Sequence, residues 1–578
     1  MRPLLPLVRS LSRFALTALL AFATSASGQL TTVRIIAFND FHGHLEPGDN
    51  AVQVPTADEP TRTVALRSGG AAYLATRVRE LRAEQPYSIV VSSGDLIGAS
   101  PLISGLFYDE PTIEVMNAMD LELNAAGNHE FDQGARELLR VVRGGCRSEP
   151  AGGRASCAGP GRTYAGAQFT FLAANVLDSK GQTLFPATLV REFGGVRVGF
   201  VGAVTRSTPG IVRPAGVADL RFTREAEAIN EAARGLLAQG VHAIVAVIHE
   251  GGETDGGFND CGNPRGAIFE IERELDARID VVLSAHTHRA YRCRIGDRIV
   301  IQGASFGRLV SVVDLAIDPQ RKRVVRDATS ARNLPVPNGL STDPRLQAAY
   351  PALAPDPAVA AIVEHYRARA APLAEQPVGR LAERFDRTPS AGGDHALGRL
   401  IADAQLEATR ENGAVIAFTN PGGIRAELRP HRGSDAVDYG DVFEVQPFGN
   451  VLVTLTLSGA QLKTLLEQQW RSGHAERPRI LQPSHGFSYA WDPARPVGAR
   501  VIVDSMRLNG RAVDPAGSYR ITVNDFLAGG GDGFRVLREG REAVGGPLDV
   551  EALTAHLLRA SAEGPLQPDR TARIARRG

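Results

Sequence analysis

The sequence predicts an α/β protein with two domains, on three observations. Short apolar, β-rich runs recur along the first half of the chain and are typical of buried strands. Between residues 30 and 318 these runs alternate with helical stretches, which indicates βαβ layering. The chain has 578 residues, more than one ordinary hydrophobic core organises. The expected strands are residues 33–38, 88–91, 121–126, 243–248 and 280–283.

Residues 1–28 are typical of a secretory signal peptide. Three arginines precede the apolar segment 14–23, and small residues follow at 25–28. The apolar segment is too short to span a bilayer. We therefore expect a periplasmic or secreted protein, with no membrane anchor after signal cleavage.

The four cysteines fit an exported protein, because an oxidising compartment favours disulfides. Four cysteines allow three pairings, and pairing neighbours along the chain is the simplest choice. The chain has no Cys-x-x-Cys pair, which disfavours a metal–thiolate site. We expect the bridges Cys146–Cys157 and Cys261–Cys293.

Composition divides the mature chain into two blocks. Residues 29–332 form the first block, and its helices are expected at 70–85, 222–240 and 266–278. Residues 333–375 are expected to be a linker, first rich in Pro, Asn, Ser and Asp and then helical from 356 to 374.

Residues 376–570 form the second, smaller block. Its helices are expected at 398–410 and 458–470. Its strands are expected at 414–418, 452–456 and 519–523. This block therefore has enough elements for a domain of its own.

A cluster of polar residues follows each of the five strands expected in the first block. Ligand sites in open α/β sheets gather where strands end at their carboxyl edge. We therefore expect carboxylates, a carboxamide and imidazoles to meet on one rim, in the number that two metal ions require. These residues are Asp40, His42, Asp95, Asn128, His249, His286 and His288.

Such a cluster suits phosphate chemistry. Two cations a few ångströms apart need a carboxylate that touches both, with neutral or anionic ligands around each. A hydroxide that bridges the cations can attack phosphorus, while the cations neutralise charge on the phosphoryl oxygens. A ligand set of oxygen and imidazole without thiolate admits Zn, Mn, Fe or Co.

The motifs Asp-x-His, Gly-Asp, Gly-Asn-His-Glu and His-x-His stand in the order found in calcineurin-like metallophosphoesterases. Residues 127–132, Gly-Asn-His-Glu-Phe-Asp, narrow this to a resemblance to the secreted 5′-nucleotidase / UDP-sugar hydrolase family. The resemblance implies a four-layer αββα catalytic domain, joined by a helical linker to a smaller C-terminal α/β domain. It implies one ion held by Asp40, His42 and His288, a second held by Asn128, His249 and His286, and Asp95 bridging both.

The resemblance also implies that His129 acts beside the metals, by stabilising the transition state or protonating the leaving oxygen. Asp132 would orient its imidazole, and the spacing of three residues suits this contact. Glu130 is expected to support the loop rather than to bind metal. The histidines outside the pattern are interpreted as ordinary surface or core residues: His44, His242, His395, His431 and His485.

Three motifs of the second block, at 420–425, 446–450 and 526–533, extend the resemblance. Phe448 and Phe526 lie beside glycines that permit close approach, so they are expected to sandwich a base. Stacking contributes about 1–3 kcal/mol per base and tolerates different bases.

The polar residues of these motifs are expected to bind the rest of a nucleotide. Asn420 and Arg425 would contact the ribose–phosphate region, and Asp532 would accept ribose hydroxyls. Asn450 completes the expected substrate set. Relatives carry phosphate-binding arginines shortly before the helix that is expected here at 398. The nearest upstream arginine in this chain is Arg387. We expect Arg425 to contact the phosphate and leave open whether Arg387 also does so.

The sequence thus predicts a secreted two-metal phosphohydrolase that acts on nucleoside 5′-monophosphates, with 2′,3′-cyclic nucleotides and UDP-sugars as further candidate substrates. The 64 basic and 64 acidic residues give no electrostatic argument for a nucleic-acid polymer as partner. Two alternatives stay open. One is an enzyme like the dimanganese thiosulfohydrolases, which the aromatic pair disfavours. The other is a nonenzymatic surface scaffold, which the complete ligand set disfavours.

Overall fold

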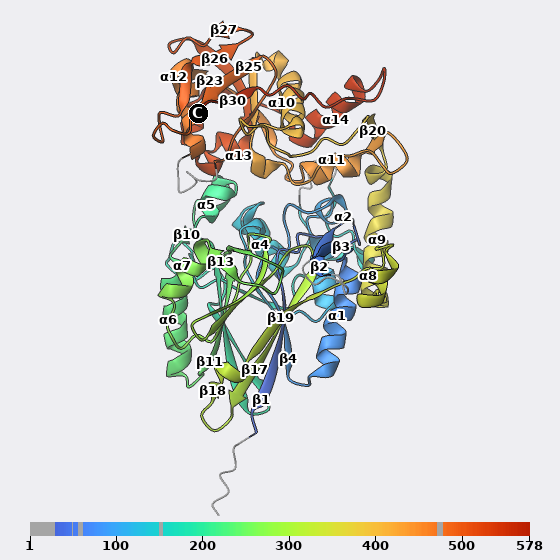
Figure 1. Cartoon of the computed structure of the whole chain (residues 1–578), viewed down its shortest axis with the longest axis vertical. Helices are drawn as coiled ribbons and strands as arrows, with labels where there is room; N and C mark the ends of the chain where they lie inside the picture. Colours follow the sequence, from blue (N-terminus) through green and yellow to red (C-terminus); the bar gives the residue numbers. More distant parts are fainter. Residues whose placement is uncertain (1–28, 49, 56–61, 149–153, 471–477) are drawn as a thin grey trace, which may run out of the picture.

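The computed structural model describes residues 29–578 except 49, 56–61, 149–153 and 471–477. The signal peptide predicted at residues 1–28 lies outside the described residues. Two domains stand one above the other along the longest axis, and the N-terminal domain is the lower one in Figure 1. Among the described residues, no helix combines the length and the apolar character needed to cross a membrane.

The N-terminal domain contains two large β-sheets. In the first sheet the strand order is β18 (Arg323–Val324), β17 (Leu309–Asp318), β1 (Thr31–Phe38), β4 (Ser88–Ser92), β5 (Leu123–Ala125) and β6 (Thr170–Leu172), and β19 (Ser330–Pro335) also pairs with β17. In the second sheet the order is β15 (Ala290–Ile295), β16 (Arg298–Gly303), β14 (Val281–Leu283), β11 (Ala243–His249), β9 (Val196–Val204) and β8 (Thr188–Phe193).

The two sheets pack face to face and helices cover their outer faces. Ile35 and Val91 of the first sheet share a fully buried cluster with Phe200 and Val245 of the second. Both faces of each sheet are covered, which explains why these strands read as continuous apolar runs rather than alternating ones. The result is the expected four-layer αββα domain. Its larger helices are α1 (Ala71–Glu84), α3 (Glu110–Ala118) and α4 (Ala135–Arg143) beside the first sheet, and α6 (Glu225–Ala238) and α7 (Ala267–Glu274) beside the second.

The expected rim is shared by the two sheets. The strands β1, β4 and β5 are parallel neighbours in the first sheet, whereas β11 and β14 are parallel neighbours in the second. The polar clusters therefore come from two sheets whose carboxyl ends meet. Local apolar pattern identifies each strand, but it does not say which strands pair.

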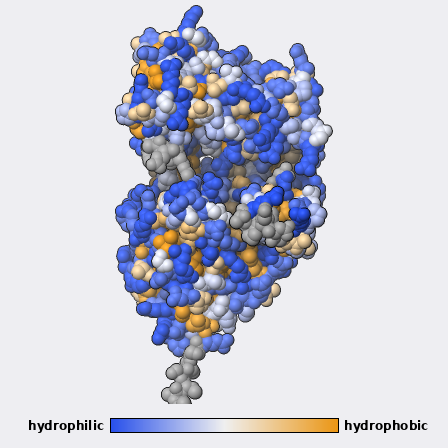
Figure 2. All heavy atoms as spheres, viewed as in Figure 1, coloured by the Kyte–Doolittle hydropathy of each residue, from blue (hydrophilic) through white to orange (hydrophobic). Residues whose placement is uncertain are grey.

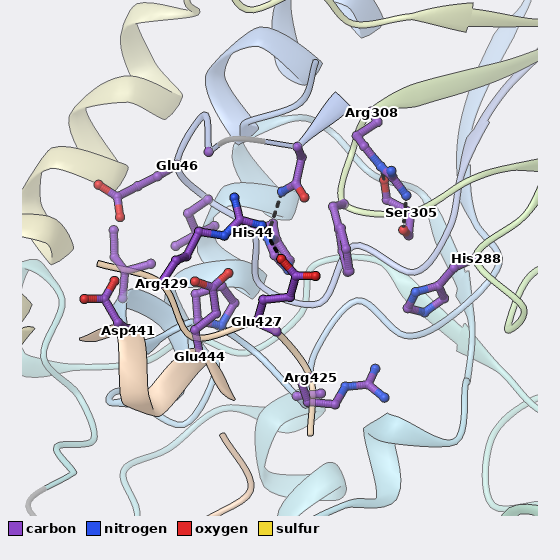
Figure 3. A pocket seen from close by; sticks show the side chains of 18 of the residues that line it. His44, Glu46, His288, Ser305, Arg308, Arg425, Glu427, Arg429, Asp441 and Glu444 are labelled. Atoms are coloured by element: carbon purple, nitrogen blue, oxygen red, sulfur yellow. Dashed lines mark hydrogen bonds and ion pairs between the residues drawn. The ribbon is translucent and has the colours of Figure 1, made fainter. Parts of the chain in front are cut away.

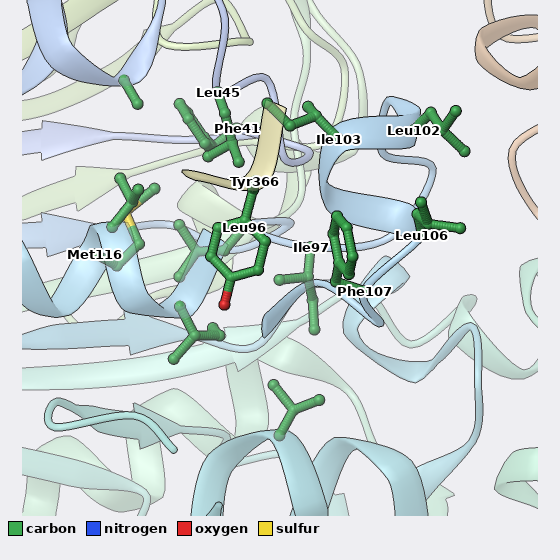
Figure 4. Close-up of a cluster of buried hydrophobic side chains, with 14 of the residues drawn as sticks. Phe41, Leu45, Leu96, Ile97, Leu102, Ile103, Leu106, Phe107, Met116 and Tyr366 are labelled. Atoms are coloured by element: carbon green, nitrogen blue, oxygen red, sulfur yellow. The ribbon is translucent and has the colours of Figure 1, made fainter. Parts of the chain in front are cut away.

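The predicted linker is more ordered than its composition indicates. Its first residues belong to β19, and α8 (Pro344–Ala349) follows. The helix expected at 356–374 forms as α9 (Pro357–Ala374), where the Asp356 side chain caps the N-terminus by accepting from the backbone N–H groups of Ala358 and Val359. Tyr366 of α9 is fully buried, and its ring centroid lies 5.0 Å from that of Phe107 (Figure 4). The long helix is thus anchored on the N-terminal domain.

The C-terminal domain is built on two smaller sheets. The first has the order β24 (Gln482–Pro483), β21 (Ile416–Thr419), β28 (Ser518–Asn524), β23 (Val451–Ser458) and β29 (Arg541–Leu548). The second has the order β27 (Arg511–Ala512), β26 (Val501–Leu508), β25 (Phe487–Trp491) and β30 (Ile574–Arg576). The main helices are α10 (Ala396–Ala408), α11 (Tyr439–Val445), α12 (Gly459–Glu467) and α14 (Asp549–Ala560).

The surface is mixed in character and is hollowed between the domains. Figure 2 shows hydrophilic residues over most of one face, with a recess where the two domains meet. The loops after β1, β4, β5, β11 and β14 reach this junction from below, and the loop 425–432 and α11 reach it from above. The junction is therefore the place where residues of both domains can act together.

Candidate metal centre and interdomain cavity

Three overlapping groups of carboxylate and imidazole side chains lie at the carboxyl ends of the strands. The ligand atoms within each group lie within 4.8 Å of one another. Asp95 connects the groups, because its Oδ2 lies 3.0 Å from His249 Nε2 and 3.6 Å from His42 Nε2. The groups are Asp40, His42 and His288; Asp95, His249 and His286; and, between them, His42, Asp95 and His129.

Backbone carbonyls orient two of these imidazoles. His42 Nδ1 lies 2.8 Å from the Gly98 oxygen, and His249 Nδ1 lies 2.8 Å from the Ser93 oxygen. A carbonyl only accepts, so each ring carries a proton on Nδ1 and turns its Nε2 toward the cluster. Contacts of this kind are the usual outer support of metal-binding histidines.

Asn128 and Asp40 fit the same chemistry. Asn128 is buried, and its Oδ1 has no hydrogen-bond partner among the described residues. An orphaned buried acceptor is costly unless a cation or a donor satisfies it. Asp40 is fully buried, and both of its oxygens accept from the backbone N–H of His286 at 3.1 Å. The residues present thus fit two divalent cations with oxygen and nitrogen ligands.

The charges of the cluster depend on one another. Burial alone would raise the pKa of Asp95, but the imidazoles of His249, His129 and His42 outweigh it and hold that pKa well below its usual range. Burial alone would lower the pKa of His249, yet Asp95 raises it to about 10. The buried carboxylate thus requires positive charge beside it, which a cation supplies as well as a proton.

His129 forms a pair with Asp132 beside the cluster. His129 Nδ1 lies 2.8 Å from Asp132 Oδ2, so the carboxylate fixes the ring and leaves Nε2 available. Burial opposes a charged ring here, but Asp132 and Asp95 outweigh it and raise the pKa of His129. The backbone N–H of His129 also donates to Asp95 Oδ1 at 2.9 Å.

Glu130 supports the loops around the cluster. Its carboxylate accepts from the backbone N–H groups of Asp95, Leu96 and Gly127 at 3.0, 2.9 and 2.7 Å. It therefore holds the loops that follow β4 and β5 together, as the sequence predicted.

A cavity of about 1120 Å³ opens from the cluster into the space between the domains. Arg425 and Arg387 of the C-terminal domain line it, and Figure 3 shows Arg425 beside His288. Sequence reasoning missed two other lining residues, His44 and His431, which it interpreted as ordinary. His44 is two residues after His42, and this spacing could have indicated that it lies near the site. His431 is distant in sequence from the other lining residues of the N-terminal domain, and only the fold brings it here.

The other expected substrate residues do not line this cavity. Phe448 lines a smaller neighbouring one, and its ring is nearly parallel to that of His129, with centroids 5.8 Å apart. Phe526 is half-buried beside the core of the C-terminal domain. No ring contact joins Phe448 to Phe526 in the described part of the chain. The base sandwich therefore stays a prediction.

The polar substrate residues are engaged within the protein. Asp532 forms an ion pair with Arg479 and accepts from Asn420 Nδ2 at 2.8 Å. Asn450 is buried, and its Nδ2 donates to Asp549 at 3.1 Å. In this arrangement Asn450 joins two elements of the C-terminal domain rather than facing a cavity, which departs from its expected place in a substrate set.

Two arginines of the N-terminal domain hold the turn that carries Phe448. Arg154 Nη2 donates to the Pro447 carbonyl at 3.3 Å, and Arg213 Nη2 donates to the Gly449 carbonyl at 3.1 Å. These bonds hold the backbone on both sides of Phe448, whose ring lies beside that of His129.

Both predicted disulfides are present. Cys146 pairs with Cys157, and Cys261 pairs with Cys293. The first closes residues 146–157, a segment that contains Arg154. The second joins the residue before β13 (Gly262–Arg265) to β15.

Two family models match the chain. Residues 33–290 match the calcineurin-like phosphoesterase family, and residues 375–539 match the 5′-nucleotidase C-terminal domain. These matches fall on the two domains described above, and the first covers the loops that carry the metal-type ligands.

Named relatives agree with these matches. Endonuclease YhcR of Bacillus subtilis is 31% identical over 531 residues, which are 91% of this chain but 39% of that relative, so the chain spans less than half of its length. The 5′-nucleotidase precursor from Thermus thermophilus is 25% identical, with a TM-score of 0.74 over 94% of this chain and 99% of that one. The Thermus thermophilus sulfate thiohydrolase SoxB, 17% identical with a TM-score of 0.67 over 94% and 97%, shares the fold. The chain therefore joins a domain of the calcineurin-like phosphoesterase family to a 5′-nucleotidase C-terminal domain.

Proposed function

We propose that this protein is an exported two-metal phosphohydrolase that releases phosphate from nucleoside 5′-monophosphates. The observation that carries the proposal is the pair of ligand groups joined through Asp95, with His129 and Arg425 at its rim. The two disulfides support export, since such bridges persist in oxidising compartments.

Seven side chains would hold the two cations. Asp40, His42 and His288 would take one, Asn128, His249 and His286 the other, and Asp95 would contact both. When bound, the cations supply Lewis-acid polarisation of the phosphoryl oxygens and acidify water at the site. Zn, Mn, Fe and Co all suit this ligand set.

His129, oriented by Asp132, would donate to the leaving oxygen. The Asp132 carboxylate holds the His129 ring by its Nδ1, so Nε2 can donate a hydrogen bond or a proton to the leaving oxygen. Arg425 would contact the phosphate, because its side chain lines the cavity beside His129 and His288.

The aromatic and polar residues of the C-terminal motifs would bind the nucleoside. Phe448 and Phe526 would stack on the base, and Asn420 and Asp532 would contact the ribose. Asp532 forms an ion pair with Arg479. When a ribose binds, this ion pair would break, or the Asp532 carboxylate would accept from Arg479 and from the ribose together. The relative named as an endonuclease suggests a polymeric substrate, but the balanced charge of this chain favours small nucleotides.

The substitution Asp95→Asn tests the proposal. It removes the carboxylate shared by both groups, so we expect bound divalent metal to fall and AMP hydrolysis to drop by more than about a hundredfold. The measurement is metal content together with phosphate release from AMP in the presence of Mn, Co or Zn. Asp120→Asn, at a position whose side chain is 81% exposed, is the matched control.

Unchanged AMP hydrolysis in Asp95→Asn would defeat the assignment. A wild-type protein that turns over a thiosulfonate and no nucleotide would instead promote the thiosulfohydrolase alternative, for which the SoxB likeness gives the fold alone. A wild-type protein that binds no metal and hydrolyses nothing would favour the scaffold.

A further inference from the structure

The turn before α3 carries an aspartate, Asp109, to which no role in metal binding or catalysis has been given above. Asp109 is half-buried and stands at the N-cap of α3, where an aspartate normally accepts from the first backbone N–H groups of its helix. Its carboxylate makes no such bond to the described residues of α3. The φ angles of Tyr108 and Asp109 are 55° and 62°, so the surrounding structure must enforce this turn. The carboxylate is therefore held for a contact outside its own helix.

That contact is with the loop that follows β4. Asp109 Oδ2 accepts from the backbone N–H of Gly98 at 3.2 Å, and Oδ1 accepts from Ser104 Oγ at 2.8 Å. Ser104 Oγ also lies 2.7 Å from Thr112 Oγ1. Because each carboxylate oxygen has its own partner, the orientation of the carboxylate is fixed. Asp109 thus joins the loop after β4 to the start of α3.

Gly98 lies between the metal-type cluster and the pair formed by His129 and Asp132. Its carbonyl accepts from His42 Nδ1 at 2.8 Å. On its other side, a Cβ atom at Gly98 would lie only 2.7 Å from Asp132 Oδ2 and 2.9 Å from His129 Cβ. Gly98 therefore has no room to move toward this pair. Since the partner of Nδ1 sets the orientation of a metal-binding imidazole, the position of Gly98 decides where His42 Nε2 points.

Asp109 acts at a distance from the substrate. It lines a small cavity of about 40 Å³, together with Gly98, His129 and Asp132. A space of this size holds a few water molecules but no nucleotide. The described lining of the large interdomain cavity does not include Asp109. Its carboxylate can therefore influence the reaction only through the residues that it holds.

We propose that Asp109 is a positioning residue of the metal centre. Its carboxylate fixes Gly98, and the Gly98 carbonyl holds the His42 ring with Nε2 toward the cluster. This inference rests on the proposed function, in which His42 holds a divalent cation. Asp109 itself touches neither the cation nor the substrate.

Titration of the metal-free protein with Mn²⁺, followed by calorimetry, tests this role. In Asp109→Gly we expect the apparent Kd for Mn²⁺ to rise about tenfold, the lower end of the change typical when a supporting partner of a metal ligand is lost. Glycine adopts a positive φ without strain, so the turn itself persists. In Asp109→Asn the side chain accepts from the Gly98 N–H and donates to Ser104 Oγ, so Kd should stay within about threefold of the wild-type value.

Asp120→Gly is the matched control. Asp120 also has a positive φ, 54°, but its side chain is 81% exposed, so we expect no change in Kd. Ser104→Ala is an independent variant that leaves residue 109 intact. It removes the partner of Asp109 Oδ1, so Kd should rise about threefold. Unfolding temperatures of the metal-free variants establish that they fold.

An unchanged Kd in Asp109→Gly and Ser104→Ala would overturn the positioning role and leave the proposed function intact. An equal rise in Asp109→Gly and Asp109→Asn would also overturn it, because the carboxamide retains the hydrogen bonds. AMP hydrolysis at increasing Mn²⁺ separates the two proposals. Asp109→Gly should reach its half-maximal rate at about tenfold more Mn²⁺ than the wild type. The expected changes in Kd without phosphate release from AMP by the wild type would confirm the role of Asp109 in metal binding and overturn the proposed function.

Discussion

Five residues of the metal-type cluster have a left-handed backbone conformation that residues other than glycine rarely adopt. Their φ angles lie between 48° and 70°. Each such residue costs of order 1–3 kcal/mol, so the surrounding loops must enforce the conformation. The loops do so through backbone bonds, such as those from Asp40 N to the Gly94 oxygen and from His42 N to the Asp95 oxygen. The residues are Asp40, His42, Asp95, His286 and His288.

At the scale of single residues, Asp132→Asn tests the orientation of His129. A carboxamide carries no charge, so it can hold the ring but no longer stabilises the protonated imidazole that donates from Nε2. We expect kcat for AMP to fall about a hundredfold with little change in KM. Metal content should not change, because Asp132 belongs to none of the ligand groups. An unaltered kcat would remove Asp132 from the proposed mechanism.

At the scale of elements, contacts that the local sequence does not predict hold the junction between the two domains. α14 begins with Asp549, which is 2% exposed and accepts from Asn450 at the end of the turn that carries Phe448. Burial raises the pKa of Asp549 to about 7. The same turn is held from the N-terminal domain by Arg154 and Arg213. Its position is therefore set by elements from both domains.

Asp549 gives this junction a pH dependence. The pKa of its carboxyl is about 7 in the folded protein and about 4 in the unfolded chain. Between about pH 4 and 7 the folded state therefore binds more protons at this site than the unfolded state does. The contribution of Asp549 therefore lowers stability as pH rises from about 4 to 7. We expect Asp549→Asn to raise the free energy of unfolding at pH 8 by of order 1 kcal/mol and to have a smaller effect at pH 4. Urea unfolding at the two pH values measures this, and a larger gain at pH 4 would contradict it.

At the scale of the whole molecule, two disulfides close loops of different length. Cys146 and Cys157 are 11 residues apart, and Cys261 and Cys293 are 32 apart. A bridge stabilises mainly by restricting the unfolded chain, and the effect grows with the logarithm of loop length. The longer loop therefore stabilises the fold more.

Paired Cys→Ser substitutions test this order. Loop entropy predicts losses of about 3.7 kcal/mol for Cys261 and Cys293 and about 2.8 kcal/mol for Cys146 and Cys157. The measurement is the free energy of unfolding by urea for each double variant. The reverse order would show that native contacts around the shorter loop, such as those of Glu110 with Ser156 and the Cys157 N–H, dominate instead.

The strands and the residue types of the metal-type cluster follow from the local sequence. The apolar runs located β1, β4, β5, β11 and β14, and the polar residues after them supplied the ligand types, because a buried strand and a metal ligand each impose strict local requirements. The order of the motifs indicated the family, and neighbouring positions along the chain indicated the disulfide pairs.

Features that depend on contacts between distant segments emerge only in the folded chain. Folding divides the five strands between two sheets, since strand pairing follows from packing rather than from local pattern. It places His44, Phe306 and Arg308 in one wall, separates Phe448 from the cavity they line, and turns Asn450 toward Asp549. These residues carry no periodic or motif signal for those positions, because the packing of one domain against the other sets them.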